Sequence, residues 1–323
     1  MREVTFLQKN ADKWKEIEVI LSSKDKVDPD KLADLFVELT DDLSYARTFY
    51  PGSKTTQYLN SLTAKIHQSI YKSKKERKER FIQFWKYEVP LLFYKHKMKI
   101  IISFTIFILS MSIGIVSSAG DSGFVRLIMG DSYVNMTLEN IDKGDPLAVY
   151  KQMNGVDMFL GITFNNIRVS FIAFIFGLFF SFGTAWILMS NGIMLGAFQY
   201  FFHIHGLLID SILVIWIHGT LEISSIIIAG AAGLVLGNSI LFPGTYSRRQ
   251  SFRIGAKEGL KMVVSLVPIF ITAGFLESFV TRHTGMPIYL SLTIILGSLA
   301  FVVWYFFIYP VKIFNKLGIK NGS

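Results

Sequence analysis

Apolar residues recur at helical spacing through the first hundred positions and gather into long runs after that. Three helices are predicted first: residues 5–22, a second with Asp28 as N-cap and Pro29 at its first position, and a third capped by Ser53. The dipeptide Pro51-Gly52 favours a turn between the last two, which then pack as a hairpin. The chain is therefore expected to begin with a small helical domain.

A fourth helix, between Lys72 and Lys99, differs because ten Lys or Arg outnumber three Glu and alternate with large apolar residues. This pattern is typical of an amphipathic helix on an anionic membrane surface, although a charged face in contact with water is the alternative. The basic residues expected at the membrane surface are Lys72, Lys74, Lys75, Arg77, Lys78 and Arg80, with Arg248 and Arg249 in a later loop. The helical domain is expected to cover residues 1–98 and to lie in the cytoplasm.

Six apolar stretches of the remaining chain are predicted to cross a membrane. They lie at about 100–119, 168–189, 192–203, 212–242, 262–279 and 288–309. The polar segment His218–Glu222 interrupts the fourth, and a broken or re-entrant helix fits residues 191–222 as well as two ordinary spans do. The predicted fold class is all-α: a polytopic transmembrane bundle over residues 99–311, preceded by the helical domain.

Charge between the apolar stretches sets the expected orientation. The segment 120–166 carries six Asp or Glu against three Lys or Arg, whereas the loop after the fourth stretch carries four Lys or Arg against one Glu. Because basic loops stay in the cytoplasm, we expect both termini inside, including the tail 312–323, and the segment 120–166 outside. The predicted location is the bacterial cytoplasmic (inner) membrane.

Composition supports a membrane protein and excludes several other classes. Of 323 residues, 51% are hydrophobic and 15% aromatic, more than two soluble domains would hold. Cysteine is absent, which excludes disulfides and thiolate metal sites. The net charge of +9 comes without a nucleic-acid-binding motif, so we expect lipid rather than nucleic acid beside the basic residues. The first thirty residues lack the apolar core of a signal peptide, so the first apolar stretch is expected to direct insertion.

Small residues mark where membrane helices are expected to touch. Gly192 with Gly196, and Gly233 with Gly237, form G-x-x-x-G pairs, and Gly230 extends the second pair. Such pairs permit close approach of two helix backbones. We therefore predict tight packing at these five glycines, within the bundle or between two copies of the chain.

The ionisable residues least expected in an apolar run are His218 and Glu222. Such groups are costly at membrane depth, and i, i+4 spacing places both on one helix face. Glu277, His203 and His205 are expected near the same side of the membrane, where several proton or metal ligands would converge. One interpretation is a His–Glu pair that only fixes a helix contact, and the other is a binding or ion-coupled site.

Arg168 is a further candidate for this polar site, because it lies at the start of the second predicted span. Its alternative role is to reach the outer headgroups. No catalytic motif accompanies these residues: the zinc-protease spacing H-E-x-x-H and the G-x-S-x-G elbow are absent from the sequence. We therefore predict no enzyme activity, no metal and no cofactor, and a metal-dependent hydrolase is the weakest alternative.

Several short motifs, taken in order, resemble the stage II sporulation protein M family. The most specific is Trp216–Glu222, followed by the glycine-rich helix Gly230–Gly237. The others are Asp42–Arg47, Pro51, Tyr58–Asn60, Asn166–Val169, Asn191–Ile193, Pro243, Arg248 and Glu277-Ser278. The long soluble N-terminal part resembles the branch of the family found in bacteria that do not form spores.

The resemblance implies a non-enzymatic membrane component. In spore formers the family member is regarded as the membrane anchor of a complex that recruits peptidoglycan-degrading enzymes during engulfment, and relatives elsewhere have an ATPase of the MoxR type and envelope proteins as gene neighbours. We therefore expect a scaffold that organises cell-envelope complexes in the lipid bilayer. Its expected partners are other envelope or membrane proteins, with an ATPase-linked cytoplasmic system and a second copy of the chain as further candidates. The alternative is a transporter or channel-like protein in which His218, Glu222 and Glu277 line a polar cavity.

Overall fold

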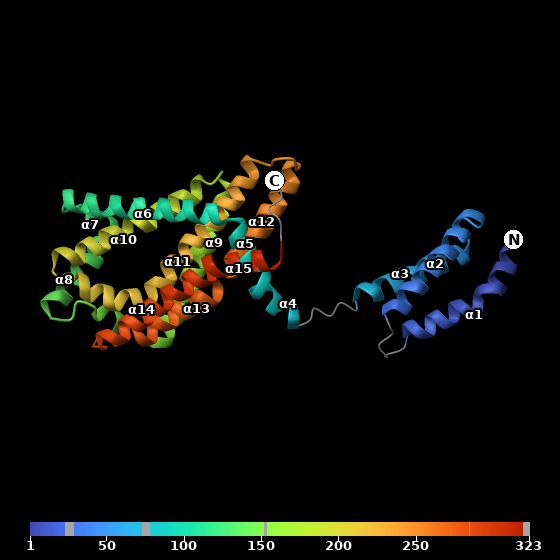
Figure 1. Cartoon of the computed structure of the whole chain (residues 1–323), viewed down its shortest axis with the longest axis horizontal. Coiled ribbons are helices and arrows are strands. Elements are labelled where there is room, and N and C mark those ends of the chain that lie inside the picture. Colours follow the sequence, from blue (N-terminus) through green and yellow to red (C-terminus); the bar gives the residue numbers. More distant parts are fainter. Residues whose placement is uncertain (23–28, 73–77, 152–153, 284, 319–323) are drawn as a thin grey trace. The chain divides into compact units, whose positions relative to one another are not determined.

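The described part of the chain is helical and contains no strand, as the sequence predicts (Figure 1). The structure is a computed structural model, and it describes residues 1–22, 29–72, 78–151, 154–283 and 285–318. The chain divides into two compact units, Met1–Ile82 and Gln83–Ser323. We call them the N-terminal unit and the membrane unit.

Three helices form the core of the N-terminal unit: α1 (Glu3–Ser22), α2 (Pro29–Phe49) and α3 (Lys54–Lys72). Their apolar stripes meet in one core, in which Trp14 is 2% exposed. The Trp14 indole N–H donates to Asp42 Oδ2 at 2.9 Å, so its polar atom is satisfied. Ser53 Oγ accepts a hydrogen bond from the Thr56 N–H at 3.1 Å, which confirms the predicted cap of the third helix. Asp28, the other predicted cap, lies outside the described residues.

The predicted basic helix is divided into α4 (Lys78–Gln83), η1 (Phe84–Glu88) and α5 (Val89–Lys95). Its apolar side packs on protein in the membrane unit, where Val89 and Phe93 are buried in the core. The Tyr305 hydroxyl donates to the Trp85 carbonyl at 2.9 Å, and Lys261 pairs with Glu88 at 2.5 Å. Residues 84–95 therefore belong to the membrane unit, although the predicted N-terminal domain ends at 98.

Among the described residues of the membrane unit, six helical segments are long and apolar enough to cross a membrane, the number predicted from the sequence. The first three are α6 (Lys97–Gly120), α9 (Gly155–Ile175) continued by η3 (Phe176–Leu178), and α10 (Phe182–Ile204). The last three are α11 (Leu208–Leu241), α12 (Arg248–Val264) with α13 (Val267–Phe275) and η4 (Leu276–Val280), and α14 (Ile288–Val303) with η5 (Trp304–Ile308) and α15 (Tyr309–Lys316). The protein is therefore a multi-pass membrane protein.

The predicted bounds of the second and third spans are wrong. The chain reverses at residues 179–181, inside the stretch predicted as 168–189, and Phe180 and Ser181 have φ of 52° and 70° there. Apolar residues make this turn, so hydropathy does not fall where the helix ends. The segment outside the spans is shorter than predicted and holds α7 (Phe124–Met129), α8 (Asp131–Asp142) and η2 (Ala148–Lys151).

Of the two alternatives for residues 191–222, two ordinary spans are confirmed, and the polar segment His218–Glu222 does not break the helix. Helix α11 is continuous from Leu208 to Leu241, and a re-entrant helix between 191 and 222 is excluded because α10 and α11 are both regular there. The polar side chains turn inward against neighbouring helices, so they do not interrupt the backbone hydrogen bonds of α11. A polar segment in an apolar run can thus indicate an interior site rather than a helix end.

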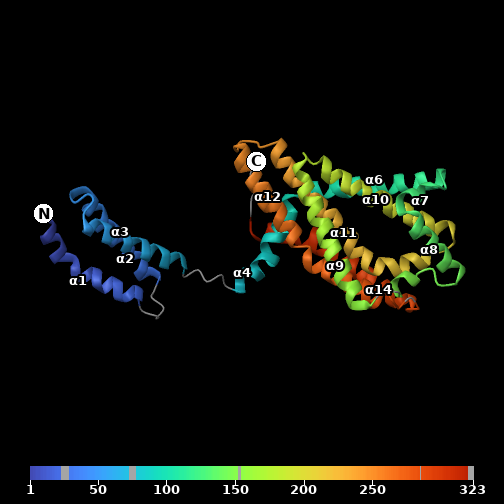
Figure 2. The same cartoon turned by 180° about the vertical axis from the view of Figure 1, so that it is seen from behind.

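Helix α11 is the centre of the membrane unit. In its most apolar stretch 67% of the residues are buried, against 17–44% in the corresponding stretches of the other spans. Helix α11 also contacts every other span. The two views in Figures 1 and 2 show α14 on one side of α11 and α9 on the other. Contacts between helix starts and helix ends show antiparallel neighbours. Gly155, at the start of α9, lies beside Arg282, which follows η4. At the other end of the unit, Lys99 near the start of α6 donates to Asn238 near the end of α11.

The five predicted packing glycines lie at close helix contacts. A Cβ on Gly192 would lie 2.7 Å from the Phe107 carbonyl oxygen, and one on Gly196 would collide with the Met111 carbonyl oxygen, so both place α10 against α6. On α11, Gly230 faces Leu188, Gly233 faces the Ala173 carbonyl and Gly237 faces the turn at Ser181. Backbone atoms cannot move aside as a flexible side chain can, and therefore the contacts of Gly192, Gly196, Gly233 and Gly237, which include backbone atoms, require glycine. The neighbours of Gly230 are side-chain atoms of Leu188 and Ser103.

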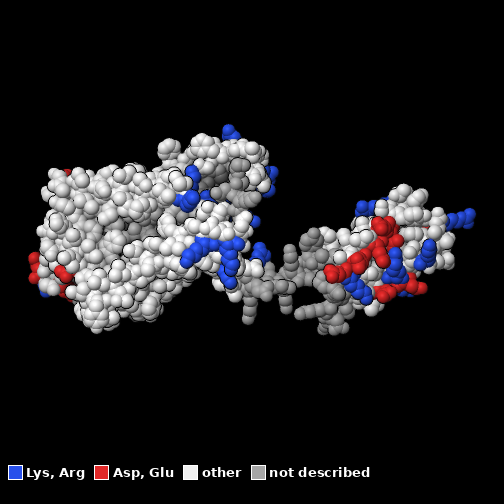
Figure 3. All heavy atoms as spheres, viewed as in Figure 1, with Lys and Arg blue, Asp and Glu red and all other residues white. Residues whose placement is uncertain are grey.

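Charges separate toward the two ends of the membrane unit (Figure 3). Exposed acidic side chains gather on α8 and at the neighbouring ends of α6, α9 and α11, and exposed Lys and Arg gather on α12 and α15. Between these ends the visible surface carries almost no charge. Arg248 and Arg249 lie exposed at the start of α12. Arg80 of α4 is exposed too. Lys74, Lys75 and Arg77 lie outside the described residues, and the side chains of Lys72 and Lys78 are not described either.

We expect Gly196→Ala to lower the free energy of unfolding by about 1–3 kcal/mol, because the added methyl group meets backbone of α6. Gly297→Ala is the matched control: Gly297 lies within α14 with no atom within 4 Å of an added Cβ. Unfolding in mixed detergent micelles, followed by circular dichroism, measures both. Equal stability of the two variants would contradict the close contact between α6 and α10.

A fragment of residues 1–72 is expected to unfold cooperatively by itself, because its core lies within the N-terminal unit. Trp14→Ala should lower its free energy of unfolding by about 3–5 kcal/mol, since the indole fills the core. Val19→Ala, at a position 68% exposed, should change it by less than about 0.5 kcal/mol. Urea titration followed by circular dichroism compares them, and a gradual transition of the unchanged fragment would count against an independent domain.

Candidate functional site

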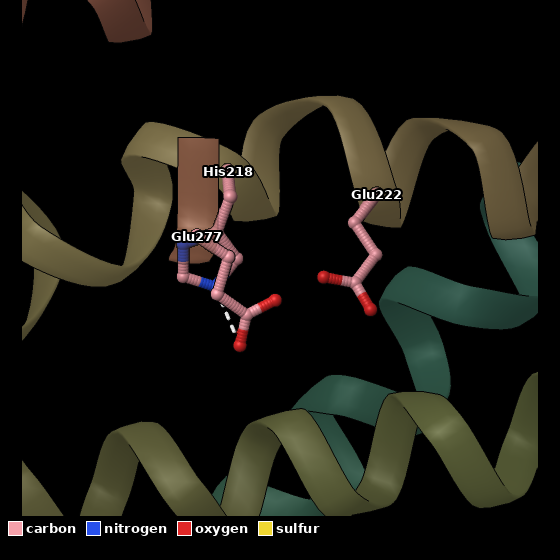
Figure 4. Close-up of side chains that lie close together, drawn as sticks. All are labelled: His218, Glu222 and Glu277. Carbon is pink, nitrogen blue, oxygen red and sulfur yellow. Dashed lines mark ion pairs between the residues drawn. The ribbon is translucent and has the colours of Figure 1, made fainter. Parts of the chain in front are cut away.

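Three ionisable side chains meet inside the membrane unit: His218 and Glu222 of α11, and Glu277 of η4. Each offers one ligand atom, and these atoms lie within 4.8 Å of one another. Figure 4 shows the carboxylates of Glu222 and Glu277 pointing toward one another, with the imidazole of His218 beside Glu277. We call these residues the His–Glu–Glu cluster.

The local sequence explains how two members share one face. His218 and Glu222 are four residues apart on a regular helix, so their side chains project in nearly the same direction. Glu277 arrives from the last turn of a different span, where η4 follows α13 as a π-helical turn. Such a turn changes the direction of the following side chains, and π-helical turns recur at functional sites.

A hydrogen bond orients the imidazole. His218 Nδ1 lies 3.1 Å from Thr281 Oγ1, and the Thr281 hydroxyl donates to the Leu276 carbonyl oxygen at 3.2 Å. Because the hydroxyl has a single proton, this arrangement makes the Nδ1–H the donor to Thr281. The other nitrogen, Nε2, lies 3.8 Å from Glu277 Oε1. The Nε2 side of the ring therefore faces this carboxylate.

The cluster lies in a nearly dry part of the bundle. The side chain of His218 is 5% exposed and that of Glu277 is 14% exposed. Two carboxylates at this separation repel one another when both are ionised, and apolar surroundings strengthen that repulsion. Protonation of one or more of these groups, or a bound cation, removes this repulsion and lets both side chains stay where the structure places them.

A cavity of about 430 Å³ adjoins the cluster and is lined by both His218 and Glu222. Its wall includes three asparagines, Asn165, Asn166 and Asn191, among apolar side chains of α6, α9, α10 and α11. Asn166 is 6% exposed; its Nδ2 meets no acceptor with full hydrogen-bond geometry among the described residues, and it lies on the side of the Glu222 carboxylate. A buried amide without a well-aligned acceptor indicates a place that a polar ligand or water occupies.

The other predicted members of the site lie elsewhere. His203 is exposed near the end of α10, and His205 Nδ1 is 2.7 Å from the Phe201 carbonyl oxygen at the same helix end. The predicted convergence therefore holds for Glu277 and not for these two histidines. Arg168 is not at the start of a span: it lies within α9, thirteen residues after Gly155 and ten before Leu178.

The surroundings of Arg168 are unusual for an arginine. Its side chain is exposed on the outward face of α9, which also carries Phe164 at 69% and Ile175 at 47% exposure. A rise of about 1.5 Å per residue places it about 20 Å from the Gly155 end, near the middle of the span. It makes no hydrogen bond or ion pair with a described residue.

Sequence reasoning missed two polar contacts that the fold creates. Thr281, which orients His218, lies beyond the predicted fifth span and carried no motif. The second contact joins His96 Nε2 to Glu258 Oε2 at 2.8 Å, with Lys95 on the other carboxylate oxygen at 2.5 Å. No local signal connects residues so far apart in the chain, although the basic run before the first span placed His96 and Lys95 near a membrane surface.

The comparisons with known proteins agree with the division of the chain. A family model described as Stage II sporulation protein M matches residues 103–282, and another, described as a domain of unknown function (DUF8413), matches residues 4–72. No curated protein and no solved structure matches the chain. The first match includes the whole His–Glu–Glu cluster and Arg168. Because it covers more than half of the 323 residues, the chain belongs to the stage II sporulation protein M family.

Proposed function

We propose that this protein is a non-enzymatic scaffold that assembles other proteins of the cell envelope in the bacterial cytoplasmic membrane. Membership of the stage II sporulation protein M family supports this role, since the family is associated with a membrane anchor of envelope complexes. The observation that carries the proposal is Arg168, exposed near the middle of a spanning helix.

An arginine in contact with lipid at this depth is costly, about 2.5–3.5 kcal/mol by membrane-insertion scales. A carboxylate on a neighbouring transmembrane helix would offset that cost and pair with the guanidinium in a low-dielectric environment. The apolar residues around Arg168 would pack against the same helix. The outward face of α9 thus has the composition of a surface that binds a partner helix with one acidic residue.

A second copy of the chain does not supply that acid. Among the described residues of the membrane unit, Glu222 and Glu277 face inward, and Glu258 is engaged by Lys95 and His96. The exposed acidic side chains gather at the end with α7 and α8. The partner is therefore a different membrane protein, and we propose that the chain does not need a homo-oligomer for this contact.

The charge distribution supports the orientation that the proposal needs. The exposed Lys and Arg on α12 and α15 support a cytoplasmic location of that end by the positive-inside rule. With six spans, both termini then lie in the cytoplasm, and the N-terminal unit with its own core is available to a cytoplasmic partner, such as an ATPase-linked system.

A photo-cross-linking amino acid placed at Phe164 in living cells is expected to yield a protein adduct. The adduct should fall several-fold in Arg168→Leu and persist in Arg168→Lys, because the partner's carboxylate requires a cation. Leu296, 59% exposed on α14, provides the control position, where lipid contact gives no such adduct. Gel analysis and mass spectrometry of the adduct measure the outcome.

Two results would contradict the scaffold. One is the absence of a protein adduct at Phe164 above the level at Leu296, and the other is an adduct that is insensitive to Arg168→Leu. An adduct consisting of two copies of this chain would contradict the proposal that the partner is a different protein.

The cavity beside His218 and Glu222 favours a second candidate function, transport of a proton or a small solute. In this case liposomes that contain the protein would show a flux that His218→Ala and Glu222→Ala abolish while the cross-link at Phe164 is unchanged. Absence of flux with the unchanged protein removes this candidate.

A further inference from the structure

We propose that the His–Glu–Glu cluster binds one divalent transition-metal cation, with Zn²⁺ and Mn²⁺ as the fitting ions. The site goes beyond the scaffold function and does not depend on it. Its ligands would be His218 Nε2 and one carboxylate oxygen each from Glu222 and Glu277. The inference rests on geometry, on charge and on the buried Asn166 amide, which lines the same cavity as Glu222.

The ligand atoms are close to the separation that a metal imposes. A tetrahedral zinc site with bonds of about 2.1 Å holds its ligand atoms roughly 3.4 Å apart. The three atoms here lie within 4.8 Å of one another without an ion. Rotation of the two Glu side chains, which have several torsions each, closes this difference, while the helices that carry them stay in place.

The surroundings of His218 resemble those of metal-binding histidines. Such residues usually donate the second ring N–H to an oxygen, which fixes the ring and presents the other nitrogen to the metal. In this protein Nδ1 donates to Thr281 at 3.1 Å, and Nε2 is on the side of Glu277. The orientation of the imidazole is therefore already that of a ligand.

Charge explains why an ion belongs at this place. Two ionised carboxylates and a neutral imidazole carry a charge of −2 in a part of the bundle where His218 and Glu277 are almost inaccessible to water. Buried charges in proteins are paired or coordinate metals, because isolated ones are very costly. A divalent cation neutralises both carboxylates at once, whereas a single shared proton leaves one negative charge.

The donor set restricts the class of metal. One imidazole nitrogen with two carboxylate oxygens suits zinc, manganese and iron, whereas calcium and magnesium prefer sites made of oxygen alone. Three protein ligands leave an open coordination position, as in many functional zinc sites. The cavity lined by His218 and Glu222 borders that position. Asn166, buried in the wall of the same cavity, can donate to a metal-bound water there.

The test uses the full chain in detergent, purified through an affinity tag that lacks histidine, and the metals alone as probes. After exposure to Zn²⁺ and removal of excess metal, elemental analysis is expected to give about one Zn²⁺ per chain. Co²⁺ should give visible absorption bands of a low-coordinate nitrogen–oxygen site. Glu222→Gln and Glu277→Gln, which keep the side-chain shape, should each lower the affinity by at least tenfold, as should His218→Ala.

Two further variants separate a metal site from general effects of polar residues. Glu258→Gln is the matched control, because Glu258 also contacts a histidine within the membrane unit, and it should keep the full metal content. Thr281→Val removes the orienting hydrogen bond and should lower the affinity by about 10- to 100-fold. Circular dichroism and gel filtration establish that each variant is folded before its metal content is compared.

The proposal is overturned if the unchanged protein binds no more Zn²⁺ or Mn²⁺ than the variant with all three ligands replaced. It is equally overturned if Glu258→Gln lowers the metal content as much as Glu277→Gln does. The metal test and the scaffold test can fail separately. Metal content is measured on purified protein, whereas the cross-link at Phe164, on the outward face of α9, is measured in cells.

Discussion

The close approach of neighbouring helices to α11 is the constraint on which the membrane unit depends. Residues 229–233 of α11 carry no side chain larger than a methyl group, so backbones and short side chains of other spans reach its surface. Helices in lipid gain little from the hydrophobic effect when they associate, and packing contacts of this kind replace it. This packing fixes α11 in the middle of the bundle and thereby fixes the direction of His218 and Glu222.

The two polar features of the membrane unit differ in where they find partners. The His–Glu–Glu cluster is enclosed by the chain's own helices and borders a cavity, so the partner proposed for it is a cation. Arg168 faces outward from α9, so the partner proposed for it is another membrane protein. Both are expensive in an apolar environment. The fold gives His218 contacts with Thr281 and Glu277, and it brings two carboxylates of like charge together. The two proposals thus concern different places: the interior of the bundle and the outward face of α9.

Much of the architecture could be predicted from local patterns. The helical period, the Pro-Gly turn and the cap at Ser53 depend on residues within a few positions of each other, and the number of spans follows from apolar length. The bounds of the second and third spans could not be predicted, because apolar residues form the turn at Phe179–Ser181. The continuity of α11 through His218 was hidden for the opposite reason: a polar segment usually indicates a helix end.

The sequence by itself determined that His218 and Glu222 share one face of a helix, since a separation of four residues is a local property of the α-helix. It also determined that both lie in an apolar run, where ionisable groups are rare. Only the tertiary structure decided that Glu277 and Thr281 join them, that His203 and His205 do not, and that Arg168 faces away from the cluster. These relations join different spans, and their relative rotation depends on side-chain packing between helices, which the period of a single helix does not specify.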